Sequence, residues 1–164
     1  MTEQPARILS VGMTGGIACG RSTIGRIFTS FGACVVDMDV VAHSLMAAGG
    51  IAAPLIGRVF GSGYLDEEGA VRRKALGDLV FSSATERARL EAILHPMILE
   101  EAGRMITEWA ADRTAGGGVA ISDAALLVET GGYRRHQRLV VVICRPELQL
   151  NRLMARDGLN EAQA

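Results

Sequence analysis

Residues 8–23 read ILSVGMTGGIACGRST, and this stretch decides the fold. The apolar run 8–12 predicts a short buried strand, and residues 15–23 nearly match the phosphate-binding loop pattern G-x-x-x-x-G-K-[ST]. Residues 21–31 have apolar side chains at helical spacing, and Gly32 is expected to end that helix. A second apolar run, 33–36, follows. Strand, loop, helix and strand within about 30 residues predict a βαβ unit and therefore a parallel sheet.

The rest of the chain predicts a helical block followed by more of the sheet. Residues 38–110 show helical patterns and no strand, which indicates an insertion beside the sheet. Pro96 is expected to begin a new helix that runs to about Ala111, because proline suits the first helical position and not the interior. The runs 119–123 and 138–144 are typical of strands covered on both faces. Pro146 is expected to begin a helix that ends near Arg156, with Asn160 capping another.

Composition limits the class of protein. Hydrophobic residues make up 49% of the 164-residue chain and the net charge is −1, so we expect a packed core and no basic field that attracts nucleic acid or a membrane surface. The sequence shows no transmembrane run and no signal peptide. The cysteines Cys19, Cys34 and Cys144 are far apart and odd in number, which argues against a disulfide framework and favours the reducing cytoplasm. Oligomeric state is left open.

The glycine-rich loop has a clear physical use. Glycines let backbone N–H groups converge on phosphate oxygens, and the N-terminus of the following helix adds positive potential. Ser22 offers a hydroxyl to Mg²⁺, and the cation at Arg21 can reach the outer phosphates. The alternative is a glycine-rich turn without a ligand, which the strand–loop–helix placement disfavours. Arg21 keeps the charge of the usual lysine but not its shape, so phosphate binding is expected to survive better than turnover.

Three aspartates follow predicted strands. Asp37 and Asp39 come at the end of the second strand, where one is expected to cap a helix and the other to act on a ligand. Asp123 ends the third strand, a position suited to holding Mg²⁺ through its water shell; a structural buried aspartate is the alternative.

Arginines and histidines complete the candidate set. Arg152 and Arg156 lie four residues apart on one predicted helical face and could close over a transferred phosphate, although a solvated basic face is favoured for Arg152. His95 is read as a helix-boundary residue, and His43 and His136 are read as surface residues.

With these residues assembled, the sequence resembles the dephospho-coenzyme A kinase family of P-loop proteins. VGMTGGIACGRST resembles its V-G-L-T-G-G-I-G-S-G-K-S-T, and GACVVDMDVVAH resembles its G-x-x-V-I-D-A-D-x-x-A-R. ISDAALLVETG resembles D-x-P-L-L-F-E-x-G, while LDEEGAVRRKALGDLVF, LEAILHPMI and LQLNRLMARDGLNEAQA resemble its helical substrate region and its lid. The similarity is colinear over essentially the whole chain.

The resemblance implies an α/β, three-layer P-loop kinase fold with a parallel sheet, a helical substrate-binding insertion and a partial lid. It divides the chain into a nucleotide-binding core at 1–42 and 115–146, a helical acceptor domain for coenzyme A at 43–114, and an incomplete lid at 147–164. The family's remaining lid helix, last strand and final helix have no counterpart before residue 164. The implied reaction transfers the γ-phosphate of ATP, with Mg²⁺, to the ribose 3′-hydroxyl of dephospho-coenzyme A, the last step of coenzyme A synthesis.

The resemblance also implies roles for individual residues. Asp39 is the base that engages the hydroxyl, and Arg21 and Arg156, the lid arginine, act with it in catalysis. Ser22 and Asp123 hold the metal. The nucleotide-binding set is Gly15, Gly16, Ala18, Cys19, Gly20, Arg21, Ser22 and Thr23. The acceptor-binding set is Asp37, Arg73, His95, Leu126, Leu127 and Glu129.

Several positions depart from the family pattern. Arg21 replaces lysine, Ala18 and Cys19 replace glycine and serine, and Ala125 and Val128 replace proline and phenylalanine. Two alternatives therefore stand beside the kinase: a catalytically impaired relative that binds a nucleotide or coenzyme A, and another small-molecule P-loop kinase.

Overall fold

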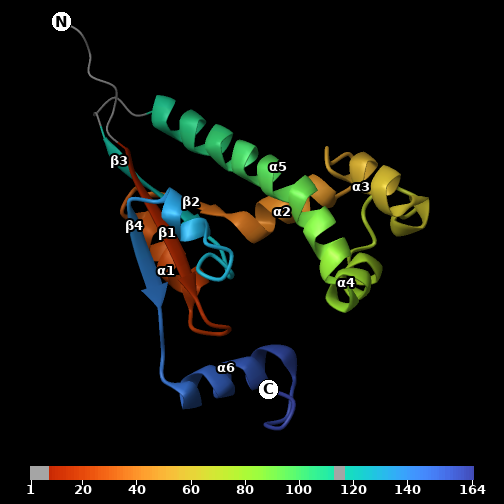
Figure 1. The fold of residues 1–164 in the computed structure, drawn as a ribbon. Coiled ribbons are helices and arrows are strands. Elements are labelled where there is room, and N and C mark those ends of the chain that lie inside the picture. The colour runs from red at the N-terminus through yellow and green to blue at the C-terminus, as the bar shows by residue number, and fades with distance from the viewer. Residues whose placement is uncertain (1–7, 113–116) are drawn as a thin grey trace, which may run out of the picture. The chain divides into compact units, whose positions relative to one another are not determined.

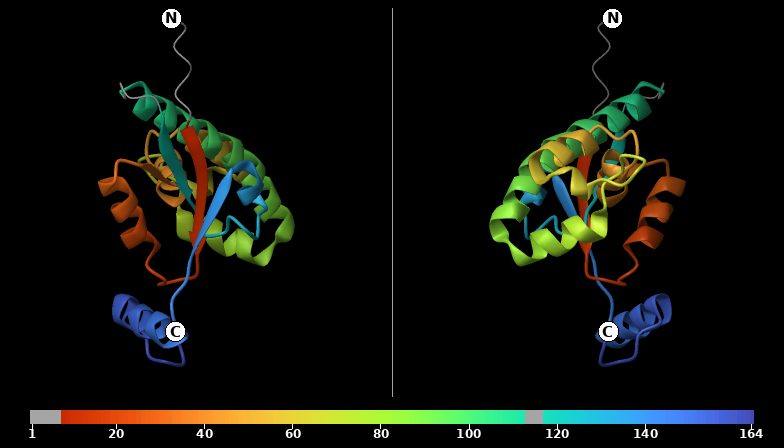
Figure 2. Two further views of the ribbon diagram at one scale, coloured as in Figure 1. Left: turned by 90° about the vertical axis from the view of Figure 1, so that its left-hand side faces the viewer. Right: turned by 90° about the vertical axis from the view of Figure 1, so that its right-hand side faces the viewer.

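The computed structural model describes residues 8–112 and 117–164. Strand β1 (Ile8–Gly15), helix α1 (Arg21–Ser30) and strand β2 (Cys34–Asp37) form the predicted βαβ start. Strands β3 (Gly118–Asp123) and β4 (Arg138–Val142) join them in one sheet of order β2-β3-β1-β4, in which every neighbouring pair is parallel. Figures 1 and 2 show β3, β1 and β4 side by side. The predicted parallel α/β fold is confirmed.

The chain folds as two compact units. One contains the sheet with α1 and α6, and the other spans Met38–Met105. The second unit overlaps the helical domain predicted at 43–114 but begins and ends earlier in the chain. The boundary predicted at 114/115 lies outside the described residues, and the functional assignment of the three segments remains a prediction.

The core of the sheet unit is aliphatic. Met13 is fully buried in β1, and Ile121 of β3 is 1% exposed. Ile24 and Phe28 of α1 pack against this cluster, as the helical spacing predicted. Gly25 is buried on the same helix, where an added Cβ would come into contact with Val35. Burial of these side chains positions the start of α1 beside the end of β1.

The second unit contains helices α2 (Met38–Met46), α3 (Ala53–Phe60) and α4 (Arg73–Ser82), the short helix η1 (Ser62–Tyr64) and most of α5 (Ala84–Ala111). Ile56 and Leu76 are buried in it. One isolated antiparallel bridge joins Leu65 to Val71, a small addition to the predicted all-helical pattern.

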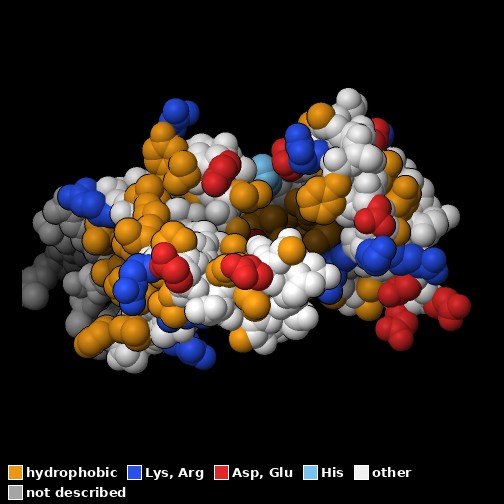
Figure 3. Space-filling view, turned by 90° about the horizontal axis from the view of Figure 1, so that it is seen from below, with side chains coloured by type: hydrophobic (Ala, Val, Ile, Leu, Met, Phe, Trp, Pro, Cys, Tyr) orange, Lys and Arg blue, Asp and Glu red, His pale blue; other side chains and the backbone are white. Residues whose placement is uncertain are grey.

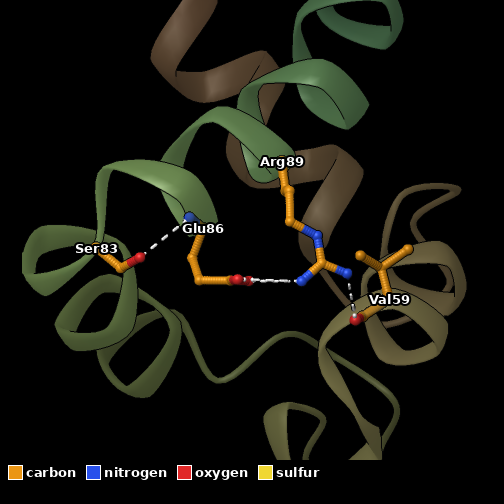
Figure 4. Close-up of polar contacts among 4 residues, drawn as sticks. All are labelled: Val59, Ser83, Glu86 and Arg89. Atoms are coloured by element: carbon orange, nitrogen blue, oxygen red, sulfur yellow. Dashed lines mark hydrogen bonds and ion pairs between the residues drawn. The ribbon is translucent and has the colours of Figure 1, made fainter.

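Arg89 links α5 to α3 within this unit (Figure 4). Its guanidinium donates to both carboxylate oxygens of Glu86, at 3.1 and 2.9 Å, and to the backbone carbonyl of Val59, at 3.4 Å. It also lies 5.5 Å from the centroid of the Phe60 ring, within cation–π range. Ser83 Oγ accepts the backbone N–H of Glu86 at 3.3 Å, which caps the start of α5.

The prediction that Pro96 begins a helix was wrong. Pro96 lies inside α5, which runs without a break from Ala84 to Ala111. A proline inside a helix removes one hydrogen bond, here to the carbonyl of Ala92, and costs about 3 kcal/mol. Ala92 and Pro96 are both exposed, so water can reach that carbonyl, while Leu94 and Ala102 stay buried on either side.

The elements of the last part of the chain follow the prediction with shifted ends, but β4 is not covered on both faces, since Leu139 is 38% and Val141 is 53% exposed. β1 extends three residues beyond the expected end at 12, and β4 stops at Val142 instead of 144. A short helix, η2 (Gly132–Arg135), precedes β4, and α6 (Pro146–Asp157) follows it with proline in its first turn. Beyond α6, Asn160 and Gln163 exchange two side-chain-to-backbone hydrogen bonds of 3.0 Å, the pattern of an N-terminal capping box.

Candidate active site

The glycine-rich loop joins the C-terminal end of β1 to the N-terminal end of α1. Gly20, with φ 96°, is the N-cap of α1 and accepts the N–H groups of Thr23 and Ile24 at 3.0 and 3.1 Å. Because glycine has no side chain to cap the helix, the first N–H groups of α1 face a position suited to an anion. A Cβ at Gly15 would overlap the carbonyl oxygen of Val142, so β4 packs directly against the loop.

Ala18 and Cys19 lie in the middle of this loop, at the positions where the family pattern has glycine and serine. Ala18 has φ 56° and is the only residue other than glycine with a positive φ among the described residues. The N–H of Cys19 donates to the carbonyl of Gly16 at 3.2 Å, and the Cys19 side chain is buried in the sheet core. The loop is therefore held by backbone turns and by a core contact.

Arg21 and Asp123 form an ion pair next to the loop. Asp123 is in register with Met13 of β1, which places the third strand beside the loop as predicted. Its Oδ1 lies 3.1 Å from Nη1 of Arg21, and Asp123 is 5% exposed. A buried carboxylate requires such a partner, since its desolvation is costly. The two residues were predicted for phosphate and metal respectively, and the structure brings them into contact with each other.

The oxygen donors suit magnesium. Ser22 is exposed in the first turn of α1, and Asp123 lies at the end of the neighbouring strand. Mg²⁺ prefers such hard oxygen ligands and usually keeps several waters. Within residues 8–112 and 117–164 there is no group of three His, Cys, Asp or Glu side chains that could hold a metal ion. The donor set fits an ion that enters with phosphate and water as its other ligands.

Asp37 and Asp39 are exposed where β2 passes into α2. Asp37 is in register with Asp123, so the ends of β2 and β3 are aligned. Asp39 lies in the first turn of α2, at the positive end of that helix and in the second compact unit. The capping role of one aspartate and the ligand role of the other stay predictions.

The segment after β3 is divided between core and solvent. Leu127 is 8% exposed, and its Cδ2 lies so close to Gly12 that a Cβ there would approach it to 2.5 Å. Leu126 is 61% exposed and Glu129 is exposed as well. Of this predicted acceptor segment, Leu126 and Glu129 are accessible to a ligand, while Leu127 packs inward. The acceptor roles remain predictions.

His136 was read as a surface residue, and this was wrong. Its Nδ1 is 2.9 Å from the hydroxyl oxygen of Ser10 in β1, and its ring lies over Gly12. Burial, with a smaller contribution from the charge of Arg135, holds the pKa of His136 below its usual value. Because Gly12 has no side chain, there is room for the His136 ring above it. The position of His136 in the sequence did not reveal this contact.

Helix α6 contacts the loop through Gln149, which the sequence did not single out, and Arg152 lies near the loop as well. Gln149 Nε2 donates to the carbonyl of Ile17 at 2.7 Å. Arg152 is exposed, as expected for a solvated basic face, and its Nη1 also lies 3.6 Å from the position of a Cβ on Gly20. Arg156 is bound to Asp157 at 2.7 and 2.8 Å, and this pairing raises the pKa of Arg156 and lowers that of Asp157. The spacing of 149, 152 and 156 on one helical face was the signal available in the sequence.

The second unit has a basic pocket on α4. It has a volume of about 440 Å³ and includes Arg73, the first residue of the helix, which was predicted to bind the acceptor. His95, from the same predicted set, is exposed on α5. The pocket is lined by Arg72, Arg73, Lys74, Ala75 and Asp78.

The surface is mixed in charge. On the face drawn in Figure 3, basic and acidic side chains are interspersed among hydrophobic ones. In the described part of the chain, no helix has the length and hydropathy needed to cross a membrane.

Comparison with known proteins gives one family. A family model described as dephospho-CoA kinase matches residues 9–164. The chain is 43% identical over 155 residues to a dephospho-CoA kinase of Nitrosospira multiformis, covering 94% of this chain and 74% of that protein. It is 43% identical over 154 residues to a dephospho-CoA kinase of Geobacter sulfurreducens, covering 94% and 77%.

Solved structures agree with the sequence relatives. The structure of TT1252 from Thermus thermophilus matches with a TM-score of 0.76 and 29% identity, covering 96% of this chain and 76% of that one. A dephospho-CoA kinase from Campylobacter jejuni matches with a TM-score of 0.64 and 26% identity, covering 95% and 76%. This chain belongs to the dephospho-CoA kinase family.

Proposed function

We propose that this protein transfers the γ-phosphate of ATP to the ribose 3′-hydroxyl of dephospho-coenzyme A, the last step of coenzyme A synthesis. Family membership supports the kinase activity and the two small-molecule substrates. The structural observation that carries the proposal is the loop between β1 and α1, with Arg21 and Asp123 beside it. We place the reaction in the cytoplasm, because the cysteines are free thiols.

The loop residues bind and orient the phosphates. Backbone N–H groups at the start of α1 stabilise phosphate charge, and Arg21 adds a cation. Ser22 and Asp123 would hold Mg²⁺, Asp123 through the waters of the ion because Arg21 already contacts Oδ1. When bound, the ion neutralises charge on the β- and γ-phosphates. Arg156 contributes from α6 by exchanging Asp157 for transferred phosphate.

Asp39 accepts the proton of the attacking hydroxyl. A positioned carboxylate of this kind contributes about 10²- to 10⁴-fold to the rate. The acceptor is held by Asp37, Arg73, His95, Leu126 and Glu129, with Leu127 supporting the segment from the core.

The test is turnover of Mg·ATP with dephospho-coenzyme A, coupled to direct measurement of ATP affinity. We expect Asp39→Asn to lose about 100-fold or more in kcat and to keep its ATP affinity. Asp112→Asn is the matched control, because Asp112 is an exposed aspartate directly after α5 and does not line the pocket on α4. Equal kcat in Asp39→Asn and the wild type would remove Asp39 from the mechanism.

A binding protein without turnover is the second candidate, and the Arg21–Asp123 ion pair is the observation that favours it. Arginine fills the lysine position and engages a carboxylate predicted for the metal. If the protein is such a binding protein, the wild type binds ATP without transferring phosphate, and Arg21→Lys restores the transfer. Turnover by the wild type that depends on Asp39 excludes this candidate.

A further inference from the structure

Two thiols that are far apart in the sequence meet beside the phosphate loop. Cys144 Sγ donates a hydrogen bond to Cys19 Sγ at 3.6 Å, and 125 positions separate the two residues. Both are free cysteines of the sheet unit. Cys19 lies in the loop between β1 and α1, and Cys144 lies between the end of β4 and the start of α6. We propose that this pair is a reversible oxidation site, at which a peroxide forms an intramolecular disulfide that fixes the phosphate loop to the start of α6.

The packing explains why these two thiols form a pair. Cys19 is 9% exposed within the core cluster of the sheet, and Cys144 is half-buried against that cluster. A disulfide bond requires the sulfurs at about 2.05 Å, so they must approach by about 1.5 Å. The loop residues on either side of Cys19, Ala18 and Gly20, have positive φ angles and are not part of a helix or strand. We expect the approach to take place in this loop and in residues 143–145, which also lie outside helices and strands.

The surroundings favour the protonated form of the Cys144 thiol. Burial raises the pKa of Cys144, the neighbouring Cys19 thiol raises it further, and Arg152 opposes the rise. Since the thiolate is the reactive form, the raised pKa makes oxidation of Cys144 slow until peroxide accumulates.

The chemistry needs only a peroxide. The half-buried Cys144 thiolate attacks one peroxide oxygen, so that an S–O bond forms, the O–O bond breaks, and the leaving hydroxide takes a proton to become water. The Cys19 thiol then loses its proton and attacks the sulfenic sulfur; the S–S bond forms, the S–O bond breaks, and a second water leaves. Two thiols are oxidised by two electrons while one peroxide is reduced to two waters. A dithiol reverses the reaction by exchange.

The consequence for phosphate transfer rests on the proposed function. Moving Cys19 toward Cys144 displaces the neighbouring loop N–H groups from the positions at which they bind phosphate. Because a misplacement of about 1 Å costs on the order of 100-fold in rate, the oxidised protein should lose turnover by about that factor. Gln149 already joins α6 to the loop at Ile17, so the disulfide would remove the remaining freedom between these elements.

Mass spectrometry tests the bond directly. The full chain is treated with hydrogen peroxide, free thiols are blocked, and tryptic peptides are mapped. The expected product links residues 8–21, which contain Cys19, to residues 139–152, which contain Cys144. The linked pair should disappear after dithiothreitol. Oxidation of one thiol to sulfinic acid without the linked pair overturns the proposal.

Variants distinguish inactivation by the disulfide from inactivation by other oxidation products. Cys144→Ala should keep the basal ATP affinity and become insensitive to peroxide, whereas Cys34→Ala should remain as sensitive as the wild type. Cys34 is the matched control because it is a half-buried cysteine of β2. If Cys144→Ala is inactivated by peroxide as fast as the wild type, the proposal is wrong. Failure of the reduced wild type to bind ATP would instead count against the nucleotide site, since the linked peptides are detected without it.

Discussion

At the scale of single residues, Ala18 is strained by its own backbone. It holds φ 56°, a region that costs a residue with a Cβ about 1 kcal/mol or more. We expect Ala18→Gly to raise the free energy of unfolding by about 0.5–1 kcal/mol, because relief of strain exceeds the added freedom of the unfolded chain. Urea unfolding followed by circular dichroism measures the difference.

The matched control for this variant is Ala48→Gly. Ala48 lies in an exposed turn and has no positive φ. There glycine adds only freedom to the unfolded chain, so the free energy of unfolding should fall by about 0.5 kcal/mol. Destabilisation of both variants would show that Ala18 carries no strain.

His136 makes stability depend on pH. Burial lowers its folded pKa below the unfolded value, so the unfolded chain binds the proton more strongly. The stability associated with neutral His136 is therefore present above the unfolded pKa of about 6.5 and is lost as pH falls through that value toward the folded pKa. Arg135, whose charge contributes to the shift, and Ser10, whose hydroxyl contacts Nδ1, are the polar groups at the ring.

Thermal unfolding between pH 8 and about pH 5 tests this dependence. We expect His136→Asn to be less stable than the wild type at pH 8 and to lose less stability on acidification. His43→Asn is the control, since His43 is exposed in α2. Parallel pH curves for the wild type and His136→Asn would contradict the interpretation.

At the scale of elements, Gln149 connects α6 to the glycine-rich loop between β1 and α1. Its side-chain amide donates to the Ile17 carbonyl at 2.7 Å. Because one such hydrogen bond is worth about 1 kcal/mol, Gln149→Leu should weaken ATP binding by about fivefold. The melting temperature should fall by only about 2–4 °C, the shift that a loss of about 1 kcal/mol gives a chain of this size.

Titration of ATP into the two proteins measures this change, with Asn151→Leu as the control for loss of an amide on the same helix. Asn151 is exposed and should leave ATP affinity unchanged. A Gln149→Glu variant should bind ATP less tightly than Gln149→Leu, because a carboxylate would face both the Ile17 carbonyl and the phosphates. Wild-type affinity in both Gln149 variants would exclude a positioning role.

At the scale of the whole molecule, different interactions stabilise the two compact units. The sheet unit depends on its aliphatic core, whereas the helical unit adds the contacts of Arg89 with Glu86, Val59 and Phe60. Arg89→Met keeps the aliphatic stem and removes the charge. We expect it to lower the free energy of unfolding by about 1 kcal/mol.

Chemical denaturation of Arg89→Met beside Arg104→Met checks this estimate. Arg104 pairs with Glu101 on the exposed side of the same helix, so its loss should have a much smaller effect. Equal destabilisation of the two variants would mean that the contacts of Arg89 with Val59 and Phe60 contribute nothing.

The local pattern determined much of this protein. Apolar runs of strand length, helical spacing in 21–31 and glycines between them predicted the βαβ start, because these signals act over a few residues. The carboxyl ends of parallel strands lie at one edge, so the sequence also placed Asp37 and Asp123 at aligned strand ends. Pro96 shows the limit: local preference predicted a helix start, and buried neighbours kept the helix continuous.

Only the tertiary structure decided which side chains meet. The Arg21–Asp123 ion pair, the Cys19–Cys144 contact and the Ser10–His136 hydrogen bond each join residues about a hundred or more positions apart. Strand register and side-chain packing fix such pairs, and neither leaves a periodic signal in the sequence. The sequence therefore predicted a phosphate-binding loop, and the packing of β3, β4 and α6 around that glycine-rich loop decided its partners.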